Sequence, residues 1–259
     1  MIIEIIITSS LLAIMFSLLG LFVILRKMSF IGTGLSHSAF GGAGIGLLLN
    51  KDYILSSIIY TAFIGQFIEN IETHLSRDSA IGIIFSFSMA LGLLSLFLSN
   101  SYVNIFSLLM GSLGGINTYL MILVIIMFIV FLFYFAREWK NLYYTSFDPI
   151  FSKVKGINNE RVERLFLLIL SITIVLGMKL VGILLLSSFL IVPPATALLL
   201  RKNIHLTMIL SILFSLISVW SGIGVSYVYD LPLGVSIVLI SILLFTIVFI
   251  IRKINKHKI

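Results

Sequence analysis

The sequence contains no cysteine, and only 10% of its 259 residues are charged. The lack of cysteine excludes disulfides and thiolate metal sites, so any metal ligand must be a histidine, a carboxylate or a hydroxyl. About a quarter of the residues in an ordinary soluble domain are charged, and this chain lies far below that share. Hydrophobic residues make up 60% of the chain instead. This composition indicates an integral membrane protein, surrounded by lipid.

Signatures of nucleotide and nucleic-acid binding are also missing. No lysine follows a glycine anywhere in the chain, so the phosphate-binding pattern GxxxxGK[ST] cannot occur. If ATP drives this protein, a separate subunit must bind it. The net charge of +7 could suggest a nucleic-acid partner. A membrane protein of this composition has no soluble basic face to bind nucleic acid, so we expect no such partner.

Nine apolar runs, separated by short polar breaks, fill almost the whole chain. Crossing the hydrocarbon core takes roughly 20 apolar residues, and most of the runs approach that length. They cover residues 5–25, 34–49, 54–73, 79–98, 118–136, 165–180, 182–200, 205–228 and 233–251. The pattern predicts an all-α, polytopic integral membrane protein with about eight to nine transmembrane helices and a single domain, 1–259. Residues 101–119 are ambiguous and could form a re-entrant or interfacial piece.

The basic residues fall almost entirely on one side of this arrangement. All lysines and arginines except Lys51 and Lys179 then lie on the same side of the membrane. Because positively charged residues concentrate in cytoplasmic loops, this side is predicted to be cytoplasmic. The N-terminus is then outside and the C-terminus is in the cytoplasm.

The longest polar stretch, residues 137–164, belongs to the cytoplasmic side. Pro149 disfavours the helical conformation at Asp148, and an aspartate there can cap a short helix that begins about Pro149. Gly156 follows this helix. The stretch is either a solvated connector or a docking surface for a cytoplasmic partner.

Small residues recur at a helical spacing in the second apolar run. Gly34, Ser38, Gly42 and Gly46 are four residues apart, and such a ridge lets membrane helices approach closely. The spacing therefore predicts a helix-packing surface.

One histidine, His37, lies within the same run. Packing does not explain it, because an ionisable group inside a span costs roughly 2.5 to 3.5 kcal/mol on insertion scales. Thr33 lies one turn earlier and can point into the same cavity. His37 is either a structural residue held by one hydrogen bond or a ligand in a transport path, since imidazole suits Zn²⁺ and its first-row neighbours.

A second polar stripe occurs in the third apolar run. Gln66, Glu69 and Asn70 share one helical face, and Arg77 marks the cytoplasmic end of this span. The stripe is interpreted as the lining of an inner vestibule. Alternatively, Glu69 pairs with a residue of a neighbouring helix.

Five motifs occur in the order found in ABC-3 family permeases, which the chain resembles over almost its whole length. They are RKMSFIGTGLSHSAFGGAGIGLLL (26–49), DSAIGIIFSFSMALGLLSL (78–96), FDPIFSKVKGI (147–157), MKLVGILLLSSFLIVPPATALLL (178–200) and YDLPLG (229–234). This family comprises the membrane subunits of bacterial zinc, manganese and iron importers. The resemblance implies a permease rather than an enzyme, multi-pass in a bacterial or archaeal plasma membrane and without a cofactor of its own.

The same resemblance implies several partners. The permease is expected to form a homodimer with two cytoplasmic ATP-binding subunits, and an external metal-binding protein delivers the ion. The segment around Asp148, Pro149 and Gly156 matches the region expected to touch the ATPase. His37 and Thr33 fall where the family's second helix lines the metal path.

The chain departs from the family pattern at several positions. Thr33 stands where family members commonly carry an aspartate, and Ser112 stands at another frequent aspartate. Where zinc-type relatives often have a histidine in the fourth helix, this chain has Phe85 or Ser86. Two alternatives therefore remain open: an ABC permease for a metal chelate or another small solute, and a secondary transporter or channel that acts alone.

Overall fold

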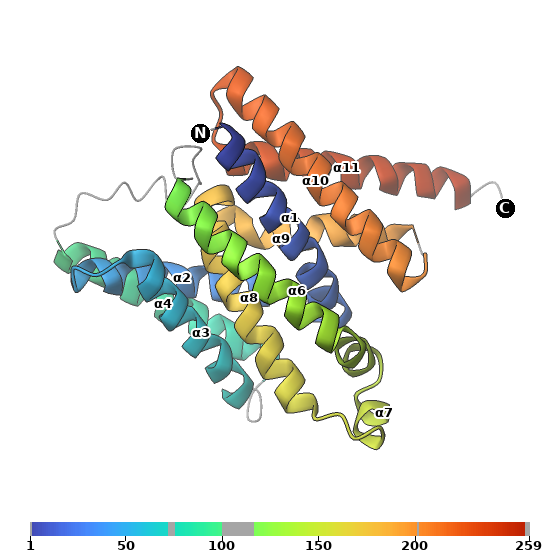
Figure 1. Cartoon of the computed structure of the whole chain (residues 1–259), viewed down its shortest axis with the longest axis horizontal. Coiled ribbons are helices and arrows are strands. Elements are labelled where there is room, and N and C mark those ends of the chain that lie inside the picture. Colours follow the sequence, from blue (N-terminus) through green and yellow to red (C-terminus); the bar gives the residue numbers. More distant parts are fainter. Residues whose placement is uncertain (1, 72–75, 100–116, 201, 257–259) are drawn as a thin grey trace.

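The computed structural model describes residues 2–71, 76–99, 117–200 and 202–256, and within these ranges the chain forms ten helices and no strand (Figure 1). The helices are α1 (Ile2–Leu25), α2 (Ile31–Leu48), α3 (Tyr53–Ile71), α4 (Arg77–Ser99), α6 (Thr118–Phe147), α7 (Pro149–Val154), α8 (Asn159–Val181), α9 (Ile183–Leu199), α10 (Ile204–Tyr229) and α11 (Leu233–Lys256). The predicted all-α class is confirmed for this part of the chain. The ambiguous segment 101–119 lies mostly outside the described residues, as does Ser112.

Six of the described helices, α1, α4, α6, α8, α10 and α11, are long and apolar enough to cross a membrane. The apolar stretches of α3 and α9 are shorter, residues 53–68 and 185–199, and α7 has six residues. The predicted number of about eight to nine membrane helices is therefore slightly off. One reason is α2, whose glycines and serines lower its hydropathy. Because neighbouring helices bury most of α2, its side chains need little affinity for lipid.

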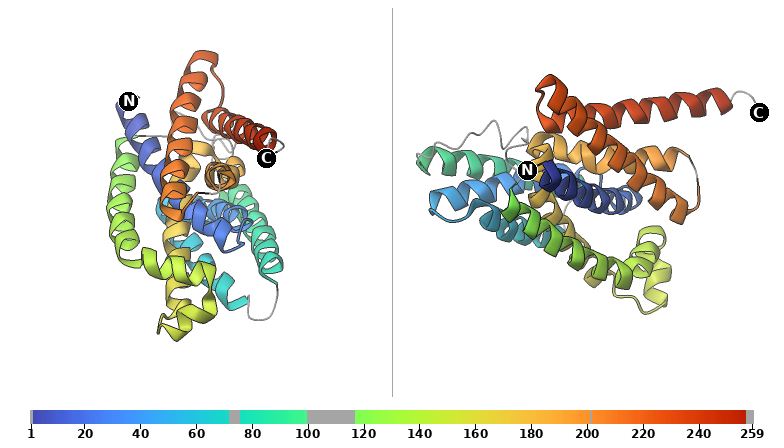
Figure 2. Two further views of the ribbon diagram at one scale, coloured as in Figure 1. Left: turned by 90° about the vertical axis from the view of Figure 1, so that its right-hand side faces the viewer. Right: turned by 45° about the horizontal axis from the view of Figure 1, so that its top comes forward.

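The helices are arranged around α1 and α8, which are largely buried, whereas α4, α6, α10 and α11 leave most of their apolar surface exposed. On one side of this centre α2 packs against α3 and α4, and on the other α10 and α11 pack together and against α9 (Figures 1 and 2). Large buried side chains such as Phe16, Phe22, Phe166 and Phe189 fill the core between them. The exposed apolar faces suit a hydrocarbon environment.

At Gly20, α1 crosses α9 at backbone distance. A Cβ at this position would overlap the carbonyl oxygen of Leu190 and would lie 3.1 Å from Pro194 Cγ. Pro194 has no N–H to bind the Leu190 carbonyl in the usual helical way. The proline and the glycine together therefore place the two helix backbones in direct contact.

The C-terminal end of α6 extends well beyond its apolar run. The run ends at residue 136, but the helix continues to Phe147, with Glu138 and Leu142 buried against the protein. Residues 137–147 contain neither glycine nor proline, and Pro149 is the first residue that stops the helix. Most of the polar stretch 137–164 is therefore helical rather than an open loop, and it divides into the end of α6, α7 and the start of α8.

Candidate functional site

The helix that carries His37 is enclosed by protein. α3, α4, α8 and α9 all pack against α2. His37 is 7% exposed, and Thr33, one turn earlier, is half-buried. The side chains of α2 therefore contact neighbouring helices rather than lipid.

The predicted ridge of small residues meets two helices instead of one. A Cβ at Gly34 would lie 2.8 Å from Ile81 Cγ2 of α4, whereas a Cβ at Gly42 would lie 2.7 Å from Ser57 Cα of α3. Gly46 also faces α3. Four residues turn a helix by about 400°, so each step of the ridge drifts by about 40°. This drift moves the far end of the ridge from α4 to α3.

A second set of glycines on α2 faces α4 and was not selected from the sequence. A Cβ at Gly41 would lie 2.8 Å from the Ser88 carbonyl oxygen, and a Cβ at Gly44 would lie 2.7 Å from the Gly92 carbonyl oxygen. The adjacent glycines 41 and 42 were the available signal, because neighbours on a helix face different directions. Both faces of α2 therefore approach other backbones closely.

Ser38 also takes part in a hydroxyl cluster that joins three helices. Its Oγ donates to the Gly34 carbonyl at 2.9 Å and lies 3.3 Å from Ser88 Oγ of α4. Ser88 Oγ in turn lies 3.3 Å from the Tyr60 hydroxyl of α3. Ser38 is therefore a polar link between helices as well as a small residue.

The His37 ring packs against Phe85 of α4. The ring centroids are 4.4 Å apart with an interplanar angle of 79°. The His37 Nδ1 atom is buried and has no hydrogen-bond partner among the described residues, so the single hydrogen bond expected of a structural histidine is not made at this atom. Ser86 points elsewhere, since its Oγ donates to the Gly82 carbonyl. Phe85 is therefore the residue of α4 that faces His37.

A metal site complete within one chain is not formed by the described residues, because no group of three or more histidine, aspartate or glutamate side chains gathers among them. The His37 nitrogen and nearby hydroxyls would bind zinc more weakly than a full set of zinc ligands, which usually number four. A second copy of the chain would double this set if the two His37 side chains met.

The predicted residues Asp148, Pro149 and Gly156 define the two ends of α7. Asp148 Oδ1 accepts hydrogen bonds from the backbone N–H groups of Ile150 (3.0 Å) and Phe151 (2.9 Å), and Pro149 occupies the first turn. Both features are typical of a helix start.

The end of α7 favours glycine. Gly156 has φ +75°, and the N–H of Ile157 donates to the Ser152 carbonyl at 3.0 Å across it. This is a Schellman-type ending, in which glycine adopts the left-handed conformation without steric cost.

Replacing Gly156 by alanine is expected to destabilise the end of α7 by about 1 kcal/mol, because a Cβ is disfavoured at this φ. Open space surrounds the position, with nothing within 4 Å of a Cβ, so the effect should be conformational rather than steric. Hydrogen exchange of the α7 amides in the purified protein measures it. Gly224→Ala, at an open position inside α10, is the control, and equal exchange of the α7 amides in wild type and Gly156→Ala would contradict the expectation.

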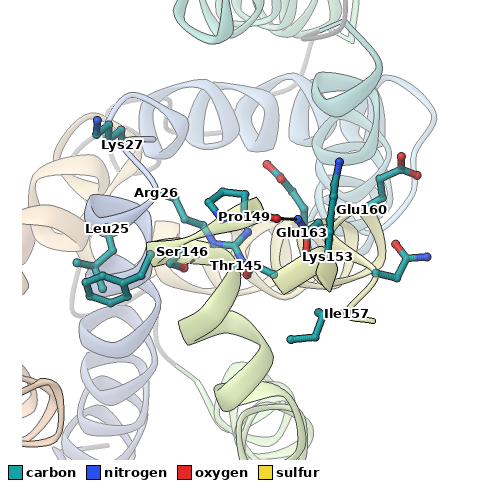
Figure 3. A pocket seen from close by; sticks show the side chains of 13 residues that line it. Leu25, Arg26, Lys27, Thr145, Ser146, Pro149, Lys153, Ile157, Glu160 and Glu163 are labelled. Atoms are coloured by element: carbon teal, nitrogen blue, oxygen red, sulfur yellow. Dashed lines mark hydrogen bonds between the residues drawn. The ribbon is translucent and has the colours of Figure 1, made fainter. Parts of the chain in front are cut away.

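The surface of α7 exposes apolar side chains beside the charged Lys153. Ile150 is 78% exposed and Val154 is 81% exposed. Beside α7 a cleft of about 690 Å³ lies between the end of α1, the end of α6 and the start of α8, lined in part by Arg26, Lys27 and Glu163 (Figure 3). The apolar helix and the charged cleft form a surface that a soluble partner can contact.

The proposed vestibule stripe is described only at Gln66. Its side-chain nitrogen donates to the Arg164 carbonyl of α8 at 3.0 Å, so this residue links α3 to α8. The side chains of Glu69 and Asn70 lie outside the described residues, and the vestibule remains a prediction.

Comparisons with known proteins agree with one another. The model of the ABC 3 transport family matches residues 1–252. The manganese transport system membrane protein MntC of Listeria monocytogenes is 29% identical over 94% of this chain and 88% of its own. The high-affinity zinc uptake system membrane protein ZnuB of Haemophilus influenzae is 32% identical over 88% of this chain and 89% of its own. The structure of PsaBC from Streptococcus pneumoniae in complex with Fab matches with a TM-score of 0.86 and 28% identity, over 95% of this chain and 90% of that chain.

Proposed function

This chain belongs to the ABC 3 transport family, and from that premise we propose that it is the membrane-spanning permease of an ATP-driven importer of divalent transition-metal ions. The observation that carries this function is the family match over residues 1–252, nearly the whole chain. The relatives described above are named for manganese and zinc transport. Iron, the third metal of the family, is a further candidate cargo.

ATP hydrolysis belongs to separate subunits in this proposal. The chain lacks the GxxxxGK[ST] pattern, which a P-loop ATPase needs to bind the phosphates of ATP. The exposed apolar residues of α7 contact such a subunit on the cytoplasmic side. An external metal-binding protein supplies the ion on the other side, and two copies of the permease enclose the path.

His37 is the proposed polar constriction of this path, with Thr33 beside it. Support comes from the buried Nδ1 atom, which has no hydrogen-bond partner among the described residues. Burying such a nitrogen costs free energy, and it requires an explanation such as an ion or a water molecule. A site of two imidazoles and a few hydroxyls is weak, and weak sites suit conduction because they release their cargo.

Uptake into vesicles tests the proposal. We expect the permease, reconstituted with its ATP-binding subunit and supplied with the external metal-binding protein, to take up Mn²⁺ or Zn²⁺ only when ATP is hydrolysed, since the chain has no GxxxxGK[ST] pattern of its own. Isotope uptake is measured for Mn²⁺, Zn²⁺ and Fe²⁺ separately, each with and without a chelator of the ion.

Two results would identify the alternatives. Uptake by the permease alone, without ATP, would indicate a secondary transporter or channel. Uptake of the chelated metal but not of the free ions would indicate a chelate permease. The absence of the family's usual aspartate at Thr33 and histidine at Phe85 is compatible with such a substrate.

A further inference from the structure

We propose that Arg26 is the positioning residue through which movement of α7 reaches α2, and this inference rests on the proposed function. Arg26 follows the last residue of α1 and precedes the corner that leads into α2. Its side chain reaches across to α6, the helix that ends beside α7. The guanidinium therefore joins the helix that would respond to the ATPase to the helix that carries His37.

The contacts of Arg26 involve two helices far apart in the sequence. Nε donates to Ser146 Oγ at 3.1 Å and Nη2 donates to Thr145 Oγ1 at 2.7 Å, both at the end of α6 (Figure 3). The guanidinium carbon lies 4.9 Å from the centre of the Phe166 ring of α8. One half-buried side chain thus connects the end of α1 with both α6 and α8.

The two acceptor hydroxyls are held by the backbone of α6. Thr145 Oγ1 donates to the Leu142 carbonyl at 3.2 Å, and Ser146 Oγ donates to the same carbonyl at 2.6 Å. Since both hydroxyl protons are directed at α6 itself, the oxygen lone pairs remain for Arg26. The acceptors therefore move with the α6 backbone.

The end of α6 is in turn joined to α7 through one residue. The Asp148 N–H donates to the Tyr144 carbonyl of α6 at 2.9 Å, while the Asp148 carboxylate caps α7. Asp148 lies two residues after Ser146. A displacement of α7 must therefore displace the hydroxyls that hold Arg26.

On the other side, Arg26 precedes a tight corner. Lys27 has φ +56°, and the N–H of Met28 donates back to the Val23 carbonyl at 2.9 Å. Met28 is buried, and α2 begins three residues later at Ile31. Because this connection is short and hydrogen-bonded, a pull on Arg26 is passed to the first turn of α2 rather than absorbed by a loop.

The geometry requires arginine rather than any cation. A planar guanidinium donates from two nitrogens to two acceptors and stacks on an aromatic ring at the same time, whereas lysine has a single ammonium group. We therefore expect Arg26→Lys to retain the charge and to lose most of the coupling.

The test uses the complete complex, the permease and its ATP-binding subunit in vesicles with the external metal-binding protein supplied, and Mn²⁺ as the probe. For Arg26→Met we expect the number of Mn²⁺ ions transported per ATP hydrolysed to fall about two- to thirtyfold, the range typical of residues that carry coupling, while ATP hydrolysis continues. The double variant Thr145→Val/Ser146→Ala should show the same fall, because it removes the acceptors and leaves Arg26 in place. Arg252→Met, which removes an arginine from α11, should couple like the wild type.

A second measurement separates coupling from general loosening of the bundle. The chain has no cysteine, so Ser29→Cys at the corner before α2 and Lys140→Cys on α6 each provide a single exposed site for an environment-sensitive fluorophore. We expect ATP to change the emission at both sites in the wild type. With Arg26→Met, the response should persist at residue 140 and vanish at residue 29.

The outcomes are distinguishable. Unchanged Mn²⁺ per ATP in Arg26→Met, or an emission response that persists at residue 29, would overturn the role of Arg26 and leave the proposed function intact. If Arg26→Met does not assemble, the double variant decides by the same two readouts. A wild-type complex without ATP-dependent uptake would instead refute the proposed function, and the role of Arg26 with it.

Discussion

Replacing His37 by alanine is expected to reduce metal uptake by the reconstituted complex at least about tenfold, because loss of even an outer-shell partner typically costs a metal site ten- to a hundredfold. Assembly and basal ATP hydrolysis should be retained, since the side chain packs only against Phe85 among the ring contacts described. Uptake of Mn²⁺ and Zn²⁺ is measured under identical ATP turnover.

The matched control for this variant is His205→Ala. His205 is an exposed histidine at the start of α10, packed against Trp139. The complex with His205→Ala should transport both ions at the wild-type rate. If His37→Ala does so as well, then His37 is a structural residue and the path lies elsewhere.

Two gain-of-function variants extend the same prediction. Thr33→Asp would place a carboxylate one turn from His37, and Phe85→His would place a second imidazole where the two rings are now 4.4 Å apart. Each adds a ligand that first-row divalent ions prefer. We expect both variants to bind Zn²⁺ more tightly by calorimetry, and unchanged affinity in both would contradict the placement of the path beside α4.

Substituting leucine for Gly42 is expected to prevent close packing of α2 on α3. A Cβ alone would lie 2.7 Å from Ser57 Cα and 3.1 Å from the Ser56 carbonyl oxygen, and these are backbone atoms that cannot rotate away. Overpacking typically costs about 1 to 3 kcal/mol when side chains can adjust, and here the helices themselves must separate. The yield of folded, monodisperse protein in detergent and its melting temperature measure the effect.

Gly224→Leu is the control for the packing prediction. This glycine lies on an exposed part of α10, and a Cβ at this position would have nothing within 4 Å. The same enlargement should therefore leave yield and melting temperature near those of the wild type. Wild-type stability of Gly42→Leu would show that the α2–α3 contact does not support the fold.

Local sequence patterns are enough to locate most helices and to predict the residues at both ends of α7. Apolar runs predict membrane helices because every backbone polar group in the hydrocarbon must be paired within its own segment. The caps at Asp148 and Gly156 are equally local, since they depend on the conformations of a few consecutive residues. The ABC-3 resemblance rested on motifs of the same local kind, and the family match confirms it.

Hydropathy alone does not mark every helix end or every membrane helix. The apolar run ends at residue 136, but α6 continues to Phe147. Polarity marks only the membrane boundary, and a helix continues into water until a residue such as Pro149 stops it. The predicted number of membrane helices was also slightly off, because it counted runs such as that of α2, a helix that is enclosed by protein and is not among the six long apolar helices.

Which helix surfaces meet depends on long-range packing. The four-residue ridge of α2 predicted one packing face, but its drift around the helix divides it between Ile81 of α4 and Ser57 of α3. The choice of Phe85 rather than Ser86 as the neighbour of His37 depends on the rotation of α4. Arg26 reaches Thr145 across 119 positions of sequence. Such contacts depend on helix crossing and rotation, which long-range packing sets and no local sequence pattern encodes.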